Sequence, residues 1–322
     1  MATTTTHTLA IKQVVSDPVV RGVFTYDTED PASFWKIFGP QQVSEGGASH
    51  EGTLQTAAFA GVSRVEGDAH SAVQELSFSR PLLSYASTMF DATIMATSHL
   101  KAALKGDVAA WWPALSEQVM EAMRGIVDSF HGRWLGATYD GIRLAVSATG
   151  TYRGLDHAAV TGWASASTTV SAALSLTPMD NMRTTLLDNE RRKMGGYTNI
   201  LWPLNQEANY QRIIGPGSRT AITVNVPNGE QPRIDLGDNR ETVLYGGRTC
   251  IALPDLLDTS IFFINRNDWK IIARESEAGN GGWAVGPSNP NAAHRDDTNL
   301  AAMFLLICDD PFRQGVLLSV TA

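Results

Sequence analysis

Hydrophobic and polar positions follow a different pattern in each successive part of this chain of 322 residues. Residues 1–45 have a Thr-rich tip, single prolines and one short aromatic cluster that includes Phe34 and Trp35. Such a segment buries too little apolar surface to fold by itself, and a free terminus of this kind is normally disordered. The pattern predicts an extended N-terminal arm.

Residues 46–83 alternate short strand-like runs with glycine turns. In an extended chain, the side chains at positions 62, 64 and 66 face one way and those at 63, 65 and 67 the other, while Gly67–Asp68 is typical of a turn. The segment is long and weakly hydrophobic. It predicts a β-hairpin that is hard to place inside a compact core.

Two helices are predicted next. Residues 84–105 are rich in Ala, Met, Leu and Thr without internal Gly or Pro, and they stop at Gly106, a usual residue just past a helix end. The second helix should begin at Pro113, a favourable first helical residue. Its apolar positions recur at steps of three and four, which predicts one buried stripe: Leu115, Val119, Met123, Ile126, Val127, Phe130 and Trp134.

The remaining pattern mixes strands and helices, which makes the fold class α+β. Strand-like runs occupy residues 142–149, and a helix over residues 176–193 ends at Gly195–Gly196. Residues 279–291 are too rich in Gly, Pro and Asn for regular structure. Further strands are predicted at 200–204, 220–226, 242–253, 261–273, 300–308 and 315–321.

Charge and cysteine usage narrow the function classes. Only 18% of residues are charged and the net charge is −8, which argues against a protein that grips nucleic acid through phosphate neutralisation. A largely neutral surface suits contact with other protein. Cys250 and Cys308 lie in separate apolar runs and predict buried free thiols and synthesis in a reducing cytoplasm. No apolar run is long enough to span a membrane, and the chain start lacks the order of a signal peptide.

The sequence motifs predict no catalytic, cofactor-binding or metal-binding site. The nucleophile pattern G-x-S-x-G is absent, and the glycine-rich stretches at 215–218 and 279–282 lack the lysine of a phosphate loop. The histidines occur singly, and consecutive residues such as 294–297 cannot all point at one ion.

One stretch combines polar side chains in a suggestive way: GTYRGLDHAAVTGW, residues 150–163. Asp156 and His157 are adjacent, so their side chains diverge and do not form a general-base pair without a third group. The structural interpretation has Gly154 permitting a turn, Asp156 capping the next segment and Trp163 anchoring it in the core. The alternative is a hydrolase that uses Asp156 and His157.

This stretch resembles the Gly-Ile-Asp-Arg…Trp signature of tailed-bacteriophage major capsid proteins of the Hong Kong 97-type (HK97-like) fold. Two later segments also resemble that family, in the same order: LPDLLDTSIFFINRNDWKI and DPFRQGVLLSVT. The residues that carry the resemblance are Tyr152, Gly154, Asp156, Trp163, Pro254, Asp255, Asn265, Trp269, Pro311 and Gly315.

The resemblance implies an order of domains. Residues 1–45 would be the N-terminal arm, 46–83 the extended β-hairpin loop, and 84–150 the peripheral domain with its long spine helix. Residues 151–265 would form mainly the axial domain, and 266–322 the return strands of the peripheral domain. Neighbouring subunits would supply the missing core of the arm and hairpin through these contacts: Phe34, Trp35, Leu54, Phe59, Val62, Arg64, Val73, Leu76 and Phe78.

The implied function is structural. Copies would form pentamers and hexamers that close an icosahedral shell around the double-stranded DNA of a tailed bacteriophage, so the protein would belong to the virion and not be an enzyme. A portal, a scaffold or protease and a decoration protein would be its partners, and the acidic chain would touch DNA only weakly. An encapsulin-like compartment shell has the same fold and is the alternative.

Three departures from the family pattern carry expectations of their own. His157 stands where the family usually has arginine, so an ion pair at this position would depend on pH. Hairpin residues 46–83 contain no lysine, which argues against covalent lysine-to-asparagine cross-linking. No long helical extension precedes the arm, so an internal scaffolding segment would be a separate protein or already removed.

Overall fold

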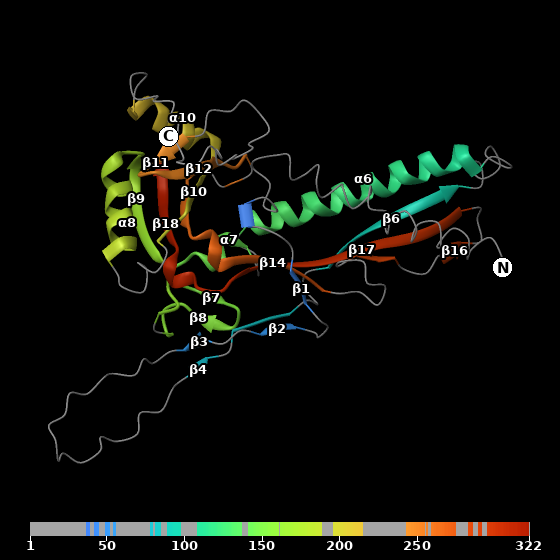
Figure 1. Cartoon of the computed structure of the whole chain (residues 1–322), viewed down its shortest axis with the longest axis horizontal. Helices are drawn as coiled ribbons and strands as arrows, with labels where there is room; N and C mark the ends of the chain where they lie inside the picture. Colours follow the sequence, from blue (N-terminus) through green and yellow to red (C-terminus); the bar gives the residue numbers. More distant parts are fainter. Residues whose placement is uncertain are drawn as a thin grey trace, which may run out of the picture.

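The chain builds two large sheets that meet end to end, and one long helix lies along the first of them (Figure 1). The computed structural model describes residues 37–38, 42–44, 49–51, 54–55, 78–79, 81–84, 89–97, 108–136, 141–160, 162–188, 196–214, 243–254, 256, 259–274, 283–285, 289–291 and 295–321. Among these residues, no helix is long and apolar enough to cross a membrane.

The first sheet, called the peripheral sheet below, is organised around one long strand, β17 (Arg295–Cys308). β17 pairs antiparallel with β14 (Trp269–Arg274), β15 (Trp283–Val285), β16 (Asn289–Asn291) and β6 (Met89–Thr97). The short strand β1 (Gln42–Ser44) extends the sheet by pairing parallel with β14. The region 279–291, expected to be irregular, contributes β15 and β16 because β17 offers both of them a pairing edge.

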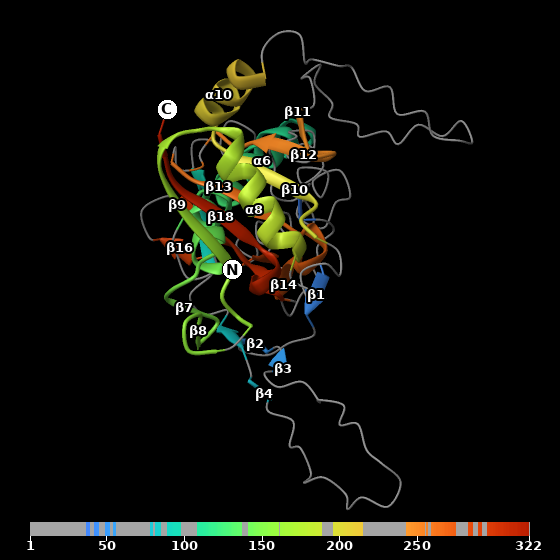
Figure 2. The ribbon, with the colours of Figure 1, turned by 90° about the vertical axis from the view of Figure 1, so that its left-hand side faces the viewer.

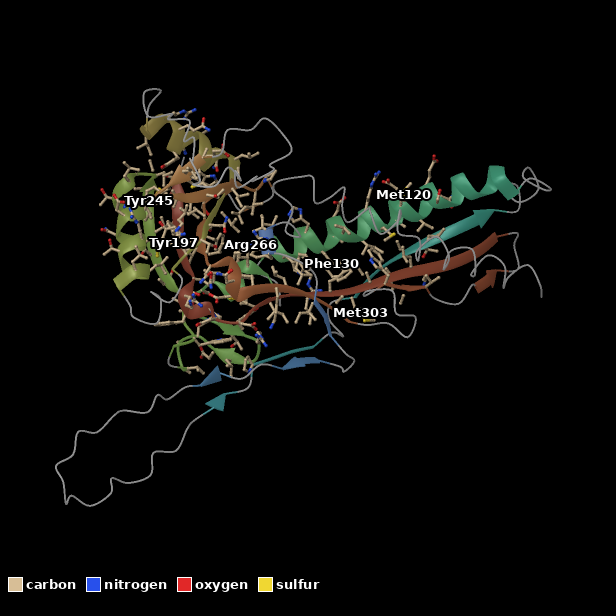
Figure 3. The ribbon with its side chains drawn as sticks, viewed as in Figure 1. Met120, Phe130, Tyr197, Tyr245, Arg266 and Met303 are labelled. Carbon is tan, nitrogen blue, oxygen red and sulfur yellow. The ribbon has the colours of Figure 1, made fainter. Side chains whose placement is uncertain are left out.

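Helix α6 (Val108–Leu135) lies along this sheet (Figure 1). The predicted stripe is confirmed from Val119 onward: its members are almost completely buried, and Phe130 meets Phe304 of β17 edge to face at 5.2 Å between ring centroids. Figure 3 shows Phe130 on the sheet side of the helix. The predicted start at Pro113 was wrong, because α6 begins at Val108 and includes the proline within its opening turns.

The helix predicted over residues 84–105 is corrected by β6, which occupies Met89–Thr97. β6 pairs with β17 along its whole length, and Phe90, Ala92 and Ile94 pack toward the core while Asp91 and Thr93 are exposed. The two-residue alternation over 90–94 was therefore the correct signal. Long-range pairing with β17 outweighs the modest helical preference of Ala and Met.

The second sheet, the axial sheet, has the order β11-β12-β10-β13-β18-β9. Its core is closed by α8 (Leu176–Asp188) and α10 (Leu204–Ile214), and Figure 2 shows α8 in front of β18 and β9. The strands are β9 (Ala166–Ala173), β10 (Asn199–Trp202), β11 (Val243–Tyr245), β12 (Arg248–Ala252), β13 (Ile261–Ile264) and β18 (Gly315–Thr321).

Two further expectations need correction. Residues 142–149, read as a strand, begin with the short helix α7 (Ile142–Ala145), whose Ile142 and Ala145 are buried. β18 was expected among the peripheral return strands, but it lies between β13 and β9 in the axial sheet. The predicted strand at 220–226 lies outside the described residues. Both cysteines are free and buried as predicted, and burial raises the pKa of each thiol.

The base of the predicted hairpin is present. β2 (Ser49–Glu51) pairs antiparallel with β5 (Leu82–Ser84), and β3 (Leu54–Gln55) pairs antiparallel with β4 (Phe78–Ser79). Both pairs follow one register, since each step along the first strand is matched by one step back along the second. Positions 56–77, which include the predicted contacts Phe59, Val62, Arg64, Val73 and Leu76, lie outside the described residues.

Candidate functional site: the junction between the two sheets

In the described part of the chain, the backbone passes between the two sheets at three places, and all three meet at one junction. The first passage is the hairpin of β7 (Thr151–Tyr152) and β8 (Leu155–Asp156), which leads from α7 to β9. The second is the short helix η3 (Arg266–Asp268) between β13 and β14. The third is η4 (Pro311–Arg313) between β17 and β18. Figure 3 labels Arg266, which marks the second passage.

Direct hydrogen bonds tie the three passages together. The Cys308 backbone N–H donates to the Tyr152 hydroxyl at 2.9 Å, which joins the first passage to the end of β17. The Ser165 hydroxyl donates to the Pro311 carbonyl at 2.7 Å. The Asp309 N–H donates to the Asp268 carbonyl at 2.8 Å, which joins the second passage to the third. The position of each sheet thus depends on contacts with the other.

The β7–β8 turn confirms the structural interpretation of residues 150–163. Gly154 has φ +77° and Arg153 has φ +53°, so the turn uses left-handed backbone at two successive positions. The Asp156 carboxylate accepts a hydrogen bond from the Ala158 N–H at 2.9 Å, the predicted cap. Trp163 is completely buried and stacks near Tyr152, with 6.1 Å between ring centroids. These contacts fix the hairpin against the core.

His157 is an internal tie of this hairpin and offers no free base. Its Nδ1 lies 3.0 Å from the Trp163 carbonyl and its Nε2 lies 3.0 Å from the Leu144 carbonyl. The imidazole lies beside both Tyr152 and Trp163, with 6.3 Å between ring centroids in each pair, and His157 is 1% exposed. A neutral imidazole can donate to only one of the two carbonyls, whereas an imidazolium donates to both. Both ring nitrogens thus face backbone carbonyls and not a carboxylate, so the pH-dependent ion pair considered for this position is not formed among the described residues.

Arg153 brings a buried charge to the junction. Its Nη1 donates to the Cys308 carbonyl and to Asp309 Oδ1, both at 3.3 Å, and its side chain is only 1% exposed. Lys270 of β14 binds the other Asp309 oxygen at 2.7 Å, while the Asp309 side chain is 46% exposed. Asp309 therefore links a buried cation of the first passage to a cation of the peripheral sheet.

Because Arg153 is buried and Asp309 is half-exposed, removing the one or the other should have unequal effects on stability. Asp309→Ala should lower the free energy of unfolding by about 2 kcal/mol, because it leaves a buried guanidinium without its counter-charge. Arg153→Met should cost less, since it removes the buried charge and leaves Asp309 paired with Lys270. Urea unfolding followed by tryptophan fluorescence would measure both variants. A larger loss for Arg153→Met would contradict this account.

A second buried network joins η3 to η4. Arg313 Nη1 donates to Asp268 Oδ1 at 2.8 Å, and the Gln314 amide donates to Asp268 Oδ2 at 3.0 Å. Gln314 Oε1 accepts from the Asn265 N–H at 2.7 Å and from the Trp269 indole N–H at 3.3 Å. Gln314 thereby contacts both ends of η3 and is completely buried.

The network places a carboxylate where water is largely excluded. Burial, the largest influence, raises the pKa of Asp268 from its usual value to about 6, although the Arg313 guanidinium and the Gln314 amide act to lower it. The nearby negative charges of Asp310 and Asp309 also raise the pKa of Asp268, because they disfavour its ionisation. Asp268 should consequently change charge in mildly acidic solution.

Gly315 shows why the third passage needs a residue without a side chain. A Cβ placed on Gly315 would lie 2.8 Å from Met182 Sδ and 3.1 Å from Leu186 Cδ1, both on the buried face of α8. Gly315→Ala should lower the free energy of unfolding by about 2 kcal/mol through overpacking.

Gly125→Ala is the matched control for Gly315→Ala. Gly125 lies on the exposed face of α6 with nothing within 4 Å of a Cβ, so the same substitution should stabilise by about 0.5–1 kcal/mol. Thermal unfolding of the two variants should shift in opposite directions. Equal shifts would rule out overpacking as the cause.

The structure brings most of the signature residues together. Tyr152, Gly154, Asp156, Trp163, Asn265, Trp269, Pro311 and Gly315 all lie in or beside the three passages. Pro254 is exposed just after β12 and takes part in none of the junction contacts described above, and Asp255 lies outside the described residues. Seven residues of the junction contacts described above were not among the predicted site residues: Arg153, Ser165, Asp268, Lys270, Asp309, Arg313 and Gln314.

The predicted inter-subunit contacts fall mainly beyond the described residues. Phe34 and Trp35 lie outside them, while the backbone of Leu54 and Phe78 forms the hairpin base through β3 and β4. Two other members of the same aromatic cluster, Ile37 and Phe38, are buried, and the centroid of the Phe38 ring lies 4.9 Å from that of Trp269. Phe38, which follows the predicted contacts Phe34 and Trp35 in the sequence, thus packs against Trp269 at the junction.

Comparison with solved structures gives the architecture a class. No protein-family model and no curated protein sequence matches the chain. The capsid of cyanophage A-1(L) matches with a TM-score of 0.66 at 13% identity, covering 90% of this chain and 93% of that chain. The capsid of a native GTA particle matches with a TM-score of 0.58 at 11% identity, covering 89% and 90%.

A third match comes from a protein compartment. The holo-SrpI encapsulin of Synechococcus elongatus PCC 7942 has a TM-score of 0.56 at 10% identity and covers 91% of this chain and 89% of that chain. The likeness therefore spans both sheets, the long helix and the junction. The fold is the HK97-like fold of shell proteins, and the resemblance read from the sequence motifs is confirmed at the level of fold.

Proposed function

We propose that the protein is a major capsid protein that assembles into pentamers and hexamers of an icosahedral shell, and that this shell encloses the double-stranded DNA of a tailed bacteriophage. The observation that carries the proposal is the likeness to the cyanophage capsid over nine tenths of both chains. Copies of one chain that meet head to tail generate closed rings when the rotation closes.

The hairpin base supports assembly. β2, β5, β3 and β4 form isolated two-stranded pairs that belong to neither of the two large sheets. A two-stranded hairpin is marginally stable by itself in water, so a further surface has to stabilise it. In the proposed shell, a neighbouring subunit supplies that surface, with the predicted contacts of the hairpin and arm as the contacting residues.

The negative net charge of the chain supports a shell that encloses DNA and does not favour a protein that binds DNA tightly. A net charge of −8 does not favour tight binding to phosphates, so the inner wall would let DNA pack and leave. We propose that such a shell is part of the virion. Its partners would be a portal, a scaffold or protease and a decoration protein. We propose no enzymatic activity, because His157 and Asp156 are engaged by backbone groups.

An encapsulin-like compartment is the second candidate, and the likeness to the Synechococcus encapsulin favours it. Both candidate functions use the same protein shell, and they differ in whether the shell encloses DNA or an enzyme. Nuclease-protected double-stranded DNA inside shells from the native host would support the capsid, whereas an enclosed enzyme would support the compartment.

Electron microscopy of the protein expressed alone, with its mass from light scattering, tests the shared part of both proposals. We expect closed shells or rings of five and six subunits. A species with the 34.8 kDa mass of one chain that stays monomeric when candidate scaffold protein is added would contradict assembly.

A further inference from the structure

One end of the axial sheet gathers positive charge around a buried hydroxyl group. β10 and β12 run parallel and in register, so Tyr197, just before β10, and Arg248, at the start of β12, share this end of the sheet. The turn of Gly246 and Gly247, which joins β11 to β12, closes the same end. Figure 3 shows Tyr197 and Tyr245, the last residue of β11, beside α8.

Arg183 of α8 brings a second guanidinium group to this turn. A Cβ placed on Gly246 would lie 3.2 Å from Cζ of Arg183 and 3.3 Å from its Nη1, so the guanidinium lies directly against the turn. Arg248 is paired with Tyr245 across β11 and β12, and paired residues point to the same face of a sheet. Since Tyr245 packs in the core beneath α8, both arginines lie on the α8 side of the sheet.

The two guanidinium groups carry charge that the described part of the chain does not pair. The side chains of Arg183 and Arg248 form no hydrogen bond or ion pair with residues of that part. Arg248 is exposed and Arg183 is half-buried, so solvent reaches both. Among the described carboxylates, Asp180 alone acts on the Tyr197 hydroxyl, and it already accepts a hydrogen bond from the Tyr245 hydroxyl at 2.5 Å. This end of the sheet therefore has an excess of positive charge on a chain whose net charge is −8.

The Tyr197 hydroxyl is a buried donor at the same place. Tyr197 is 2% exposed, and its hydroxyl has no hydrogen-bond partner among the described residues. Burial, the largest influence, raises the pKa of Tyr197, while the charges of Arg183 and Arg248 lower it, so both guanidinium groups are close enough to act on the hydroxyl. Buried polar groups in native proteins nearly always have a partner. An unpaired hydroxyl beside two unpaired cations therefore indicates an anionic ligand.

We propose that this end of the axial sheet binds a small tetrahedral oxoanion of the phosphate or sulfate class, held by Arg183, Arg248 and the Tyr197 hydroxyl. Guanidinium groups bind such ions through charge-assisted hydrogen bonds, often in pairs. A tetrahedral oxoanion has more oxygens than a carboxylate, so it can accept at once from donors on α8, on β12 and before β10. The site goes beyond the proposed function and does not depend on shell assembly.

Titration calorimetry with inorganic phosphate tests the site on the full-length chain. We expect a dissociation constant on the order of 1 mM, because both guanidinium groups remain partly in water. About 20 mM phosphate should then raise the melting temperature by about 2 °C over sodium chloride of equal ionic strength. An equal increase in both salts would overturn the proposal, because it would reflect screening of the net charge alone.

Tyr197→Phe removes the hydroxyl and leaves the ring. Without phosphate, this variant should melt no lower than the wild type, because the hydroxyl has no hydrogen bond to a described residue to lose. Its affinity for phosphate should fall by about tenfold, since a hydrogen bond to an anion is lost. A variant that melts lower without phosphate but binds phosphate as the wild type does would show that the hydroxyl is purely structural, and would overturn the site.

Arg183→Gln should also weaken phosphate binding by about tenfold, because it removes a charge-assisted contact. Arg124→Gln is the matched control, since it removes the same charge from the exposed side of α6. The control should bind phosphate as the wild type does. Equal losses from the two variants would mean that phosphate responds only to the net charge of the chain, which would contradict a defined site.

Competition with a short thymidine oligonucleotide separates the two sources of the oxoanion. Displacement of phosphate by the oligonucleotide would assign the site to the phosphates of a nucleic acid, whereas phosphate binding that the oligonucleotide leaves unchanged would assign it to the free ion. Both results retain the proposed site. Failure of the wild type to bind phosphate would overturn the site and leave the proposed shell function standing, because electron microscopy measures assembly separately.

Discussion

Deletion of residues 52–79 is expected to leave a folded subunit that no longer forms stable shells. The deletion removes β3, β4 and everything between them but keeps the β2–β5 pair. In that pair Glu51 lies opposite Leu82, so Arg80 and Pro81 remain to connect them. Two residues are the length of a tight hairpin turn, and the base can therefore close without disturbing the two sheets.

The size of the effect follows from the area that such a segment buries. If the hairpin covers on the order of 1,000 Å² of apolar surface on a neighbour, the gross gain is about 25 kcal/mol, most of it offset by ordering the segment. Removing it should abolish shells in negative-stain images, while near-ultraviolet circular dichroism of the subunit should stay unchanged. Wild-type shell yield would exclude the hairpin from assembly.

A second version of the deletion protects the test against a poor turn. Inserting Asn-Gly between Glu51 and Arg80 lengthens the connection to four residues and adds a favourable turn sequence. If both versions fold and neither assembles, the loss belongs to the removed segment and not to a damaged base.

The free energy of unfolding should fall as the pH rises from about 4 to about 6 through the titration of Asp268. The pKa of Asp268 is about 6 in the folded chain and 3.8 without the fold, so the folded state binds more protons than the unfolded state in this range. Stability contributed by the protonated form is then lost as the carboxyl ionises in the buried junction. A difference of about two pKa units corresponds to about 3 kcal/mol.

Asp268→Asn isolates this contribution from other carboxylates. The amide keeps the shape and does not titrate, and its one oxygen can accept from either Arg313 or Gln314 but not from both, which adds a loss that does not change with pH. Wild-type stability minus that of the Asn variant should therefore decrease by about 3 kcal/mol between pH 4 and pH 7 in urea unfolding. Asp128→Asn on the exposed side of α6 controls for the loss of one carboxylate. A difference that grows with pH would show that the Arg313 ion pair outweighs burial.

Local periodicity was sufficient for some elements and misleading for others. The stripe of α6 was found because Val119 to Trp134 repeat at helical spacing and face one sheet. β6 was missed because its partner β17 lies about two hundred positions away, and composition around Ile94 favours a helix. The start of α6 was missed because Pro113 is tolerated inside the helix. The course of β18 between β13 and β9 is a property of the sheet that residues 315–321 do not reveal by themselves.

The junction shows the same division. Trp163 and Asp156 could be assigned roles from turn chemistry and apolar bulk, and the structure confirms both contacts. Gly315 was singled out by the family resemblance alone. The reason that a glycine is needed there is the close approach of Met182 and Leu186, which depends on how α8 packs and cannot be read from the sequence. Nothing near Gln314 in the sequence signals that one amide would meet Asn265, Asp268 and Trp269, because those partners lie about fifty residues earlier.

The place of β18 in the axial sheet has a consequence for how the protein is made. β18 follows every other described strand in the sequence, yet it sits inside the sheet, where β13 and β9 both depend on it. A growing chain on the ribosome therefore cannot complete this sheet until its final strand has emerged. Chains that stop early would lack the strand that holds β9, so unfinished copies should be removed by proteolysis before they can enter an assembly and spoil it.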